Sequence, residues 1–116
     1  MIDTLFSRGK SFSNFPFKVI WLPENNESTL QAGIGVSSRY FKKAVDRNRI
    51  KRLVRESYRL QKKILFDHLE AKQLHLSVFI LYMGKELPEY ETVFEKTGTI
   101  LKRLIKFTDE DIKKPA

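Results

Sequence analysis

The chain has 116 residues, of which 41% are hydrophobic and 12% are aromatic, so it can build one core but is too short for two domains. It contains no cysteine, which excludes a disulfide framework and a cysteine-ligated zinc site. No stretch approaches the roughly 20 apolar residues that a membrane-spanning helix needs, and the N-terminus lacks the apolar run of a secretory signal. We therefore expect a single soluble domain over residues 1–116 that works in the cytoplasm.

The net charge is +8, and it is concentrated in one segment. Residues 39–63 hold eleven Lys or Arg side chains against two acids, Asp46 and Glu56, so this segment alone carries +9 and the other residues together carry −1. Clustered charge creates a local field that attracts phosphates, whereas evenly spread charge mainly affects solubility. The pattern predicts that the partner is a polyanion.

The N-terminal part of the chain is predicted to be extended. Residues 11–22 follow the alternation of a strand. The side chains of its two faces are, on one side, Phe17, Val19 and Trp21 and, on the other, Lys18 and Ile20. A polar turn over residues 24–28 leads into a second strand over residues 30–37, so we expect the two to pair as an antiparallel hairpin. Gly33 and Gly35 indicate that another group approaches the second strand closely.

Four aromatic side chains of this region could either fill the core or stack on unpaired bases. Aromatic residues in strands are more often core, and we assign Phe17 and Trp21 to it. Phe12 and Phe15 fit either role, because the strand that carries them is expected to be short and exposed.

The second half of the chain predicts a helix, a strand and a helix. Residues 44–65 place one core-facing stripe at helical spacing, made of Ile50, Leu53, Val54, Ser57, Gln61 and Ile64. Residues 74–83 are apolar on both faces, which is typical of a strand inside a sheet. A last helix begins near Pro88, and the tail over residues 109–116 is expected to be flexible. The apolar stripe of this last helix is made of Tyr90, Val93, Phe94, Thr97, Leu101, Leu104 and Ile105. The fold class is therefore α+β, and the first helix is long enough to let its flanking strands pair in parallel.

The outward face of the helix over residues 44–65 is basic. It carries Asn48, Lys51, Arg52, Arg55, Arg59, Lys62 and Lys63. Guanidinium groups grip phosphate oxygens as planar forks, and Asn48 can donate to a phosphate or ribose while it accepts from a base. A solvated helix face normally mixes Glu with Lys at i,i+4, whereas here only Glu56 relieves the repulsion. A rigid array of one sign predicts an anionic partner and suits a folded RNA.

Other kinds of site find little support in the sequence. His68 and His75 are the only histidines, and a metal site normally needs three or four convergent ligands, so we expect no metal site on the protein. The acids are too scattered for a nuclease that holds its own magnesium. Membrane-surface binding would need apolar groups exposed beside the basic face, but the apolar stripe has only the width that a core needs. A general basic-helix nucleic-acid-binding protein remains as the alternative function.

The sequence around the basic helix resembles a known family. Residues 44–55, Ala-Val-Asp-Arg-Asn-Arg-Ile-Lys-Arg-Leu-Val-Arg, are similar to the signature helix of the protein subunit of bacterial ribonuclease P, whose hallmark is the Arg-Asn-Arg core. Residues 33–39 are similar to its third strand and residues 5–10 to the end of its first helix, and the likeness extends to about residue 107. The resemblance implies a single-domain αβββαβα sandwich of the ribosomal protein S5 domain 2 type. It also implies a mixed sheet and a left-handed crossover, against the general right-handed rule.

The resemblance also implies a function. In this family the RNA subunit, with bound magnesium ions, catalyses removal of the 5′ leader of precursor tRNA, and the protein is an accessory that is inactive alone. Ribonuclease P RNA and precursor tRNA are thus the implied partners and Mg²⁺ the implied cofactor, with no catalytic residue on the protein, no membrane and no small-molecule substrate. The residues implied to bind the RNA subunit are Arg39, Lys43, Arg47, Asn48, Arg49, Lys51, Arg52, Arg55 and Arg59.

In the family, the single-stranded leader lies in a cleft between the first helix, the sheet and the signature helix. The residues implied to line it here are Phe6, Phe12, Lys18 and Ile20. Phe6 is the main stacking candidate, because other aromatic cleft positions of the family fall on Ile2 and Ile20. The family usually has a basic N-terminal arm and a fuller first helix, so we expect a truncated first helix here. Lys42 and Tyr40 stand where the family often has glycine and lysine.

Overall fold

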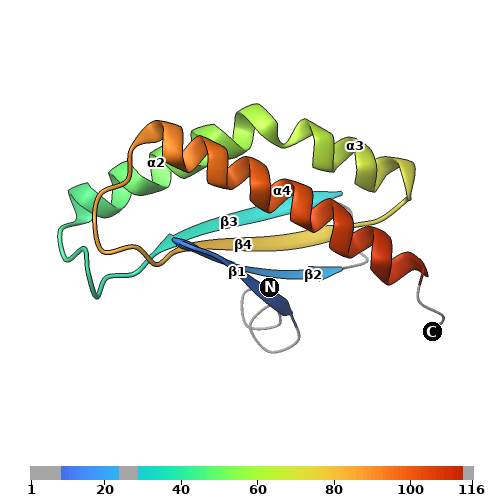
Figure 1. Cartoon of the computed structure of the whole chain (residues 1–116), viewed down its shortest axis with the longest axis horizontal. Helices are drawn as coiled ribbons and strands as arrows, with labels where there is room; N and C mark the ends of the chain where they lie inside the picture. Colours follow the sequence, from blue (N-terminus) through green and yellow to red (C-terminus); the bar gives the residue numbers. More distant parts are fainter. Residues whose placement is uncertain (1–8, 24–28, 114–116) are drawn as a thin grey trace.

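The computed structural model describes residues 9–23 and 29–113, with side chains described up to residue 109 (Figure 1). In chain order the elements are β1 (Lys10–Asn14), β2 (Phe17–Pro23), β3 (Leu30–Val36), α2 (Ala44–Gln61), α3 (Lys63–Ala71), β4 (Leu76–Tyr82) and α4 (Tyr90–Lys113). The predicted α+β class is confirmed. The predicted truncated first helix, with Ile2 and Phe6, lies outside the described residues.

The described strands form one mixed sheet in the order β1-β2-β4-β3. β2 is antiparallel to both β1 and β4, whereas β3 is parallel to β4. The predicted hairpin between residues 11–22 and 30–37 is therefore wrong, since β4 lies between β2 and β3. The predicted single strand over residues 11–22 is itself a hairpin that turns at Phe15 and Pro16. β4 takes an inner place because it is apolar on both faces, and an inner strand has more of each face covered by neighbouring side chains than an edge strand has.

The three described helices cover one face of the sheet (Figure 1). α2 and α3 cross over from β3 to β4 and let these strands run parallel, as the length of this segment predicted. The left-handed sense of the crossover stays an implication of the family resemblance. Within residues 9–23 and 29–113, no helix combines the length and the apolar content that crossing a bilayer would require.

The core lies between this helical layer and the sheet. The strand alternation places Phe17 and Trp21 in it, as predicted, together with Val19 between them. β4 contributes the next row of the same face, made of Leu76, Val78, Ile80 and Tyr82. From the helices come Ile50, Val54, Leu65, Leu69, Val93, Ile100, Leu101 and Leu104.

The predicted helix over residues 44–65 is two helices, because Lys62 lies in a turn between α2 and α3. Ile50 and Val54 are buried as predicted, but Ile64 is 49% exposed. Leu65 and Leu69 of α3, at i+4 spacing from Gln61, face the core instead. The prediction failed because no proline or glycine in the sequence marks the turn at Lys62.

α4 begins at Tyr90, close to the predicted start near Pro88. Its predicted stripe is buried at Val93, Thr97, Leu101 and Leu104, whereas Tyr90 and Phe94 are partly exposed at its first turns. The helical backbone continues to Lys113, beyond residue 109, where the flexible tail was expected to begin.

Candidate nucleic-acid interface

α2 has two faces with opposite properties. Ile50, Val54 and Ser57 are fully buried against the rest of the protein. The outward side is formed by five exposed residues that we call the α2 basic face: Asn48, Arg49, Arg52, Arg55 and Arg59. Lys51 lies half-buried at its edge. Asn48, Arg52, Arg55 and Arg59 follow one another at spacings of four, three and four residues, which lines them up along one side of a helix.

Three of these arginines are available to an external partner. Within the part of the chain that the structure describes, Arg49, Arg52 and Arg55 have no hydrogen-bond or ion-pair partner in the protein. Like charges at i,i+3 and i,i+4 repel one another on a helix, which costs a few tenths of a kcal/mol per pair. An anionic partner removes this cost, because it neutralises the charges that cause it.

Arg47 has a different environment from the α2 basic face. Its side chain is half-buried, and its Nη1 donates to the carbonyl oxygens of Phe41 and Lys42, both at 2.7 Å. Lys43 occupies the N-cap position of α2 without a capping hydrogen bond from its side chain. The guanidinium of Arg47 therefore ties the preceding loop to the first turn of α2, and it holds in place the segment that carries Arg39 and Lys43.

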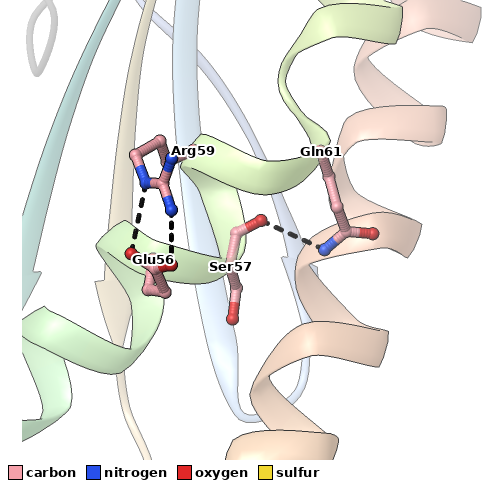
Figure 2. Close-up of polar contacts among 4 residues, drawn as sticks. All are labelled: Glu56, Ser57, Arg59 and Gln61. Atoms are coloured by element: carbon pink, nitrogen blue, oxygen red, sulfur yellow. Dashed lines mark hydrogen bonds and ion pairs between the residues drawn. The ribbon is translucent and has the colours of Figure 1, made fainter.

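Arg59 is paired within the protein (Figure 2). Its Nη2 donates to Oε1 of Glu56 at 2.6 Å and its Nε donates to Oε2 at 3.2 Å. These hydrogen bonds hold the pKa of the Glu56 carboxyl below its usual value, so Glu56 stays ionised and offsets the charge of Arg59. Burial raises the pKa of the neighbouring Tyr58 hydroxyl to about 12, so Tyr58 adds no negative charge here near neutral pH. Arg59 therefore contributes less to the positive field than the unpaired arginines.

The C-terminal end of α2 is fixed to α4 by Gln61. Its Nε2 donates to the carbonyl of Ser57 at 3.2 Å and to the carbonyl of Phe94 in α4 at 2.9 Å. A Cβ at position 98 would lie 2.6 Å from Oε1 of Gln61, so Gly98 leaves the space that this side chain occupies. Glycine inside a helix costs about 1 kcal/mol relative to alanine, and this contact gives a reason for its presence. The two ends of α2 are thus both held, which keeps the basic face in one orientation.

The loop before α2 brings two more predicted residues, Arg39 and Lys43, beside the start of the helix, and both are exposed. The guanidinium of Arg39 lies 5.7 Å from the centre of the Tyr40 ring, and Nζ of Lys85 lies 5.5 Å from the same ring. Cations near an aromatic face are attracted by its quadrupole. Tyr40 thus links the cations of this loop to the β4–α4 loop, a connection that the sequence did not indicate.

The residues predicted for the leader cleft separate into two faces. Lys18 and Ile20 lie on the sheet face opposite the helices, where they pair with Leu81 and Phe79 of β4. Phe12 instead pairs with Val19 and lies on the helical side. Its ring centre is 5.2 Å from that of Phe107 in α4, and the guanidinium of Arg103 stands 4.3 Å from its centre. The structure therefore brings Lys18 and Ile20 together but not Phe12, and Phe6 lies outside the described residues.

Phe79 is an aromatic residue of the sheet face opposite the helices that the sequence did not single out. It is the direct cross-strand partner of Ile20. A Cβ at Gly33 or Gly35 would lie 3.0 or 2.7 Å from its ring, so the ring lies across the two glycines of β3. The close approach that the glycines predicted is confirmed. Their spacing of two residues places both on one strand face, and this was the only signal in the sequence for an aromatic ring there.

Comparisons with known proteins converge on one family. A family model described as Ribonuclease P matches residues 1–105. The ribonuclease P protein component of Porphyromonas gingivalis is 37% identical over 94 residues, which cover 79% of this chain and 69% of that protein. The corresponding component of Chlorobium phaeobacteroides is 30% identical over 113 residues, covering 87% and 77%.

Solved structures show the same fold. The RNase P protein from Thermotoga maritima superposes with a TM-score of 0.71 at 29% identity, covering 88% of this chain and 89% of that one. The RNase P protein of Staphylococcus aureus gives a TM-score of 0.72 at 21% identity, covering 89% and 87%, which is a likeness of fold.

Proposed function

Because the chain belongs to the bacterial ribonuclease P protein family, we propose that it docks on ribonuclease P RNA through the α2 basic face and assists removal of the 5′ leader of precursor tRNA in the cytoplasm. RNA binding and tRNA processing follow from membership of the family, as does the role of accessory component in an endoribonuclease. The proposal goes further in three respects. It names the RNA that the protein binds, the contact with the leader and the role of magnesium.

The observation that carries the proposal is the set of unpaired arginines on a helix held at both ends. Arg49, Arg52 and Arg55 are exposed and project from one rigid element. Each arginine that neutralises a phosphate releases condensed counterions, and this release supplies much of the affinity of proteins for nucleic acids. Because the array has a fixed shape, it favours an RNA whose phosphates also have a fixed shape. Asn48 in the same row supplies both a donor and an acceptor for ribose or base.

The described side chains do not form a magnesium site of their own. Within residues 9–23 and 29–109, no three His, Asp or Glu side chains converge as ligands. Glu56, the acid beside the α2 basic face, is bound by Arg59. On the family resemblance, we assign the magnesium ions and the catalytic chemistry to the RNA, and give the protein the task of binding phosphates.

For the leader we propose the sheet face that carries Lys18 and Ile20, opposite the helices. Lys18 is exposed and can meet a phosphate, whereas Ile20 is only 7% exposed and pairs with Phe79 across the strands. Phe6 stays part of this proposal on the family resemblance alone. Phe12 is left out, because its packing against Phe107 and Arg103 places it on the other side of the sheet.

The experiment that tests the proposal is cleavage of a precursor tRNA by a bacterial ribonuclease P RNA at low magnesium, with and without this protein. We expect the protein alone to be inactive and to restore correct 5′ cleavage when the RNA is present. Cleavage by the protein without RNA would refute the assignment of catalysis. Equal binding of ribonuclease P RNA and unrelated folded RNAs at the same salt concentration would instead favour a general nucleic-acid-binding protein.

A further inference from the structure

A groove at one end of the molecule has properties that the α2 basic face does not explain. It lies between the β1–β2 turn and the segment that joins β4 to α4, and its volume is about 500 Å³. Its walls include Phe15, Pro16, Met83 and Leu87, with Lys85 and Lys96 also in the lining. We call it the end groove.

We propose that the end groove binds one unpaired nucleotide of the RNA that docks along α2, with its base against Phe15 and its phosphate near Lys85. This inference rests on the proposed function, because it takes the RNA as the partner.

The groove is held in shape by contacts within the protein. The N–H of Met83 donates to the carbonyl of Pro16 at 2.7 Å, which fastens the hairpin turn to the end of β4. The hydroxyl of Tyr82 donates to the carbonyl of Glu86 at 2.6 Å and so holds the segment between β4 and α4 against the end of β4. A Cβ at Gly84 would collide with this hydroxyl, so only glycine lets the chain pass so close. A preformed site binds with less loss of conformational entropy than a mobile one.

The exposed apolar side chains of the groove suit a nucleobase. Phe15 is 78% exposed, although a phenylalanine ring loses favourable free energy when it is left in water. Met83 and Leu87 are also exposed beside it. An aromatic ring of this kind can stack on any base, because every base has a π-face.

The charges of the groove lining indicate whether the groove binds a nucleobase or a run of backbone phosphates. Lys85 and Lys96 are matched by Glu86 and Glu89, so the lining carries no net charge. A surface for duplex phosphates would be uniformly positive, as the α2 basic face nearly is. Carboxylates can accept hydrogen bonds from the amino groups of bases, and a single lysine suffices for one phosphate. The mixture therefore fits one unpaired nucleotide.

The position of the groove connects it to the RNA-binding helix. Lys85 in the groove lining and Arg39 in the loop before α2 both lie near the ring of Tyr40, at 5.5 and 5.7 Å. An RNA strand that follows α2 toward its N-terminal end would meet Arg39 and then Lys85. The path between the two sites is thus lined by cations.

The test compares the affinity of the full chain and its variants for ribonuclease P RNA at fixed salt. We expect Phe15→Leu, which keeps an apolar side chain but loses the ring, to bind about 5- to 150-fold more weakly, which is the range that stacking of one base supplies. Phe15→Trp should bind at least as well as the unaltered chain. Phe66→Leu is the matched control, because Phe66 is a partly exposed ring on α3 that does not line the groove. Near-ultraviolet circular dichroism confirms that each variant is folded.

A second measurement uses adenosine monophosphate as the probe, followed by NMR on the full chain. We expect the amide signals of Gly84 and Lys85 to shift, and the shifts to be lost in Phe15→Leu. If the unaltered chain does not prefer ribonuclease P RNA, the proposed function fails. If it does, but Phe15→Leu binds within twofold of it and the nucleotide moves no signal in the groove, the nucleotide site is refuted and a protein segment becomes the better occupant.

Discussion

α2 and α4 pack on the same face of one sheet, and both bury an apolar stripe, yet their exposed faces differ. The exposed charges of α4 are mixed, with Glu91 and Glu95 followed by Lys102 and Lys106. The exposed face of α2 carries four arginines and a single acid at its edge, Glu56. Mixed charge is typical of a solvent-exposed helix face, whereas charge of one sign destabilises the helix that carries it. The buried stripes therefore explain the fold, and the difference between the exposed faces indicates the function.

A second comparison, among the arginines of α2, shows that charge alone does not define the interface. Arg47 is bonded to two loop carbonyls and Arg59 to Glu56. In the described structure Arg49, Arg52 and Arg55 have no such partners, so their donors are available to phosphates. Variants at these two groups should behave differently.

The largest effects should come from the buried stripes, where the two helices are alike. Ile50→Ala in α2 and Leu104→Ala in α4 remove fully buried side chains, so each should lower the free energy of unfolding by about 2–5 kcal/mol. Urea denaturation followed by circular dichroism measures this. Lys102→Ala on the exposed face of α4 is the control and should change stability by less than about 0.5 kcal/mol. A loss below about 1 kcal/mol at either buried site would contradict the packing described here.

The double variant Arg52→Ala/Arg55→Ala tests the difference between the exposed faces. It should weaken binding of ribonuclease P RNA by at least roughly 100-fold, since each of the two lost charge-assisted hydrogen bonds contributes about 1.5–3 kcal/mol, and the melting temperature should change little. The slope of log affinity against log salt should also fall by about 1.5–2 units, because two phosphate contacts are lost.

The matched control for this double variant is Lys102→Ala/Lys106→Ala, which removes the same number of charges from α4. It should alter RNA affinity by less than about threefold, because short-range contacts and not net charge carry the binding. Equal losses from the two double variants would mean that the RNA responds to the total charge of the protein, and the assignment to α2 would fail.

Arg47→Ala should combine a loss of stability with a loss of affinity. Removing its guanidinium leaves two loop carbonyls without their donor, which should cost about 1–2 kcal/mol of unfolding free energy. Because the loop with Arg39 and Lys43 is then less well held, RNA affinity should also fall, by about tenfold. For comparison, Arg49→Ala should lower RNA affinity but leave the stability unchanged. Filter binding measures the affinity, and thermal denaturation measures the stability. Unchanged stability in Arg47→Ala would show that its hydrogen bonds do not order the loop.

Features that depend on local pattern were predictable from the sequence. The alternation of Phe17, Val19 and Trp21 correctly identified the core face of β2, because a strand repeats every two residues regardless of its neighbours. The position of β4 between β2 and β3 was not predictable in this way. Alternation identifies which face is buried but contains no information about which strand lies next to it, and here the order depends on a long crossover.

The candidate site shows the same division. The exposed row from Asn48 to Arg59 follows from helical spacing alone. The internal bonds of Arg47 depend on the conformation of the preceding loop, and the pairing of Ile20 with Phe79 depends on the register between β2 and β4. Contacts of this kind join segments that are far apart in the sequence or lack regular structure. The residue types therefore identified the basic surface, but not which of its side chains already bond to other groups of the protein.

The smallest expected effect concerns the one acid that relieves the α2 basic face. Glu56→Gln keeps the size of the side chain but removes its charge, so Arg59 becomes available and RNA affinity at neutral pH should rise about two- to threefold. Arg59→Gln should lower affinity by a similar factor, because the charge it removes is already offset by Glu56.

The same pair predicts a pH dependence of stability. Since the pKa of Glu56 is lowered in the fold, its stabilising contribution is present above its ordinary pKa of 4.5 and is lost as the pH falls through the lowered value. Both side chains are well exposed, 60% for Arg59 and 46% for Glu56, so this contribution is small. Melting temperatures of the unaltered chain and of Glu56→Gln should therefore differ slightly at pH 6 and converge toward pH 3. A difference that grew as the pH fell would contradict the direction of the pKa shift and, with it, the pairing of Glu56 with Arg59.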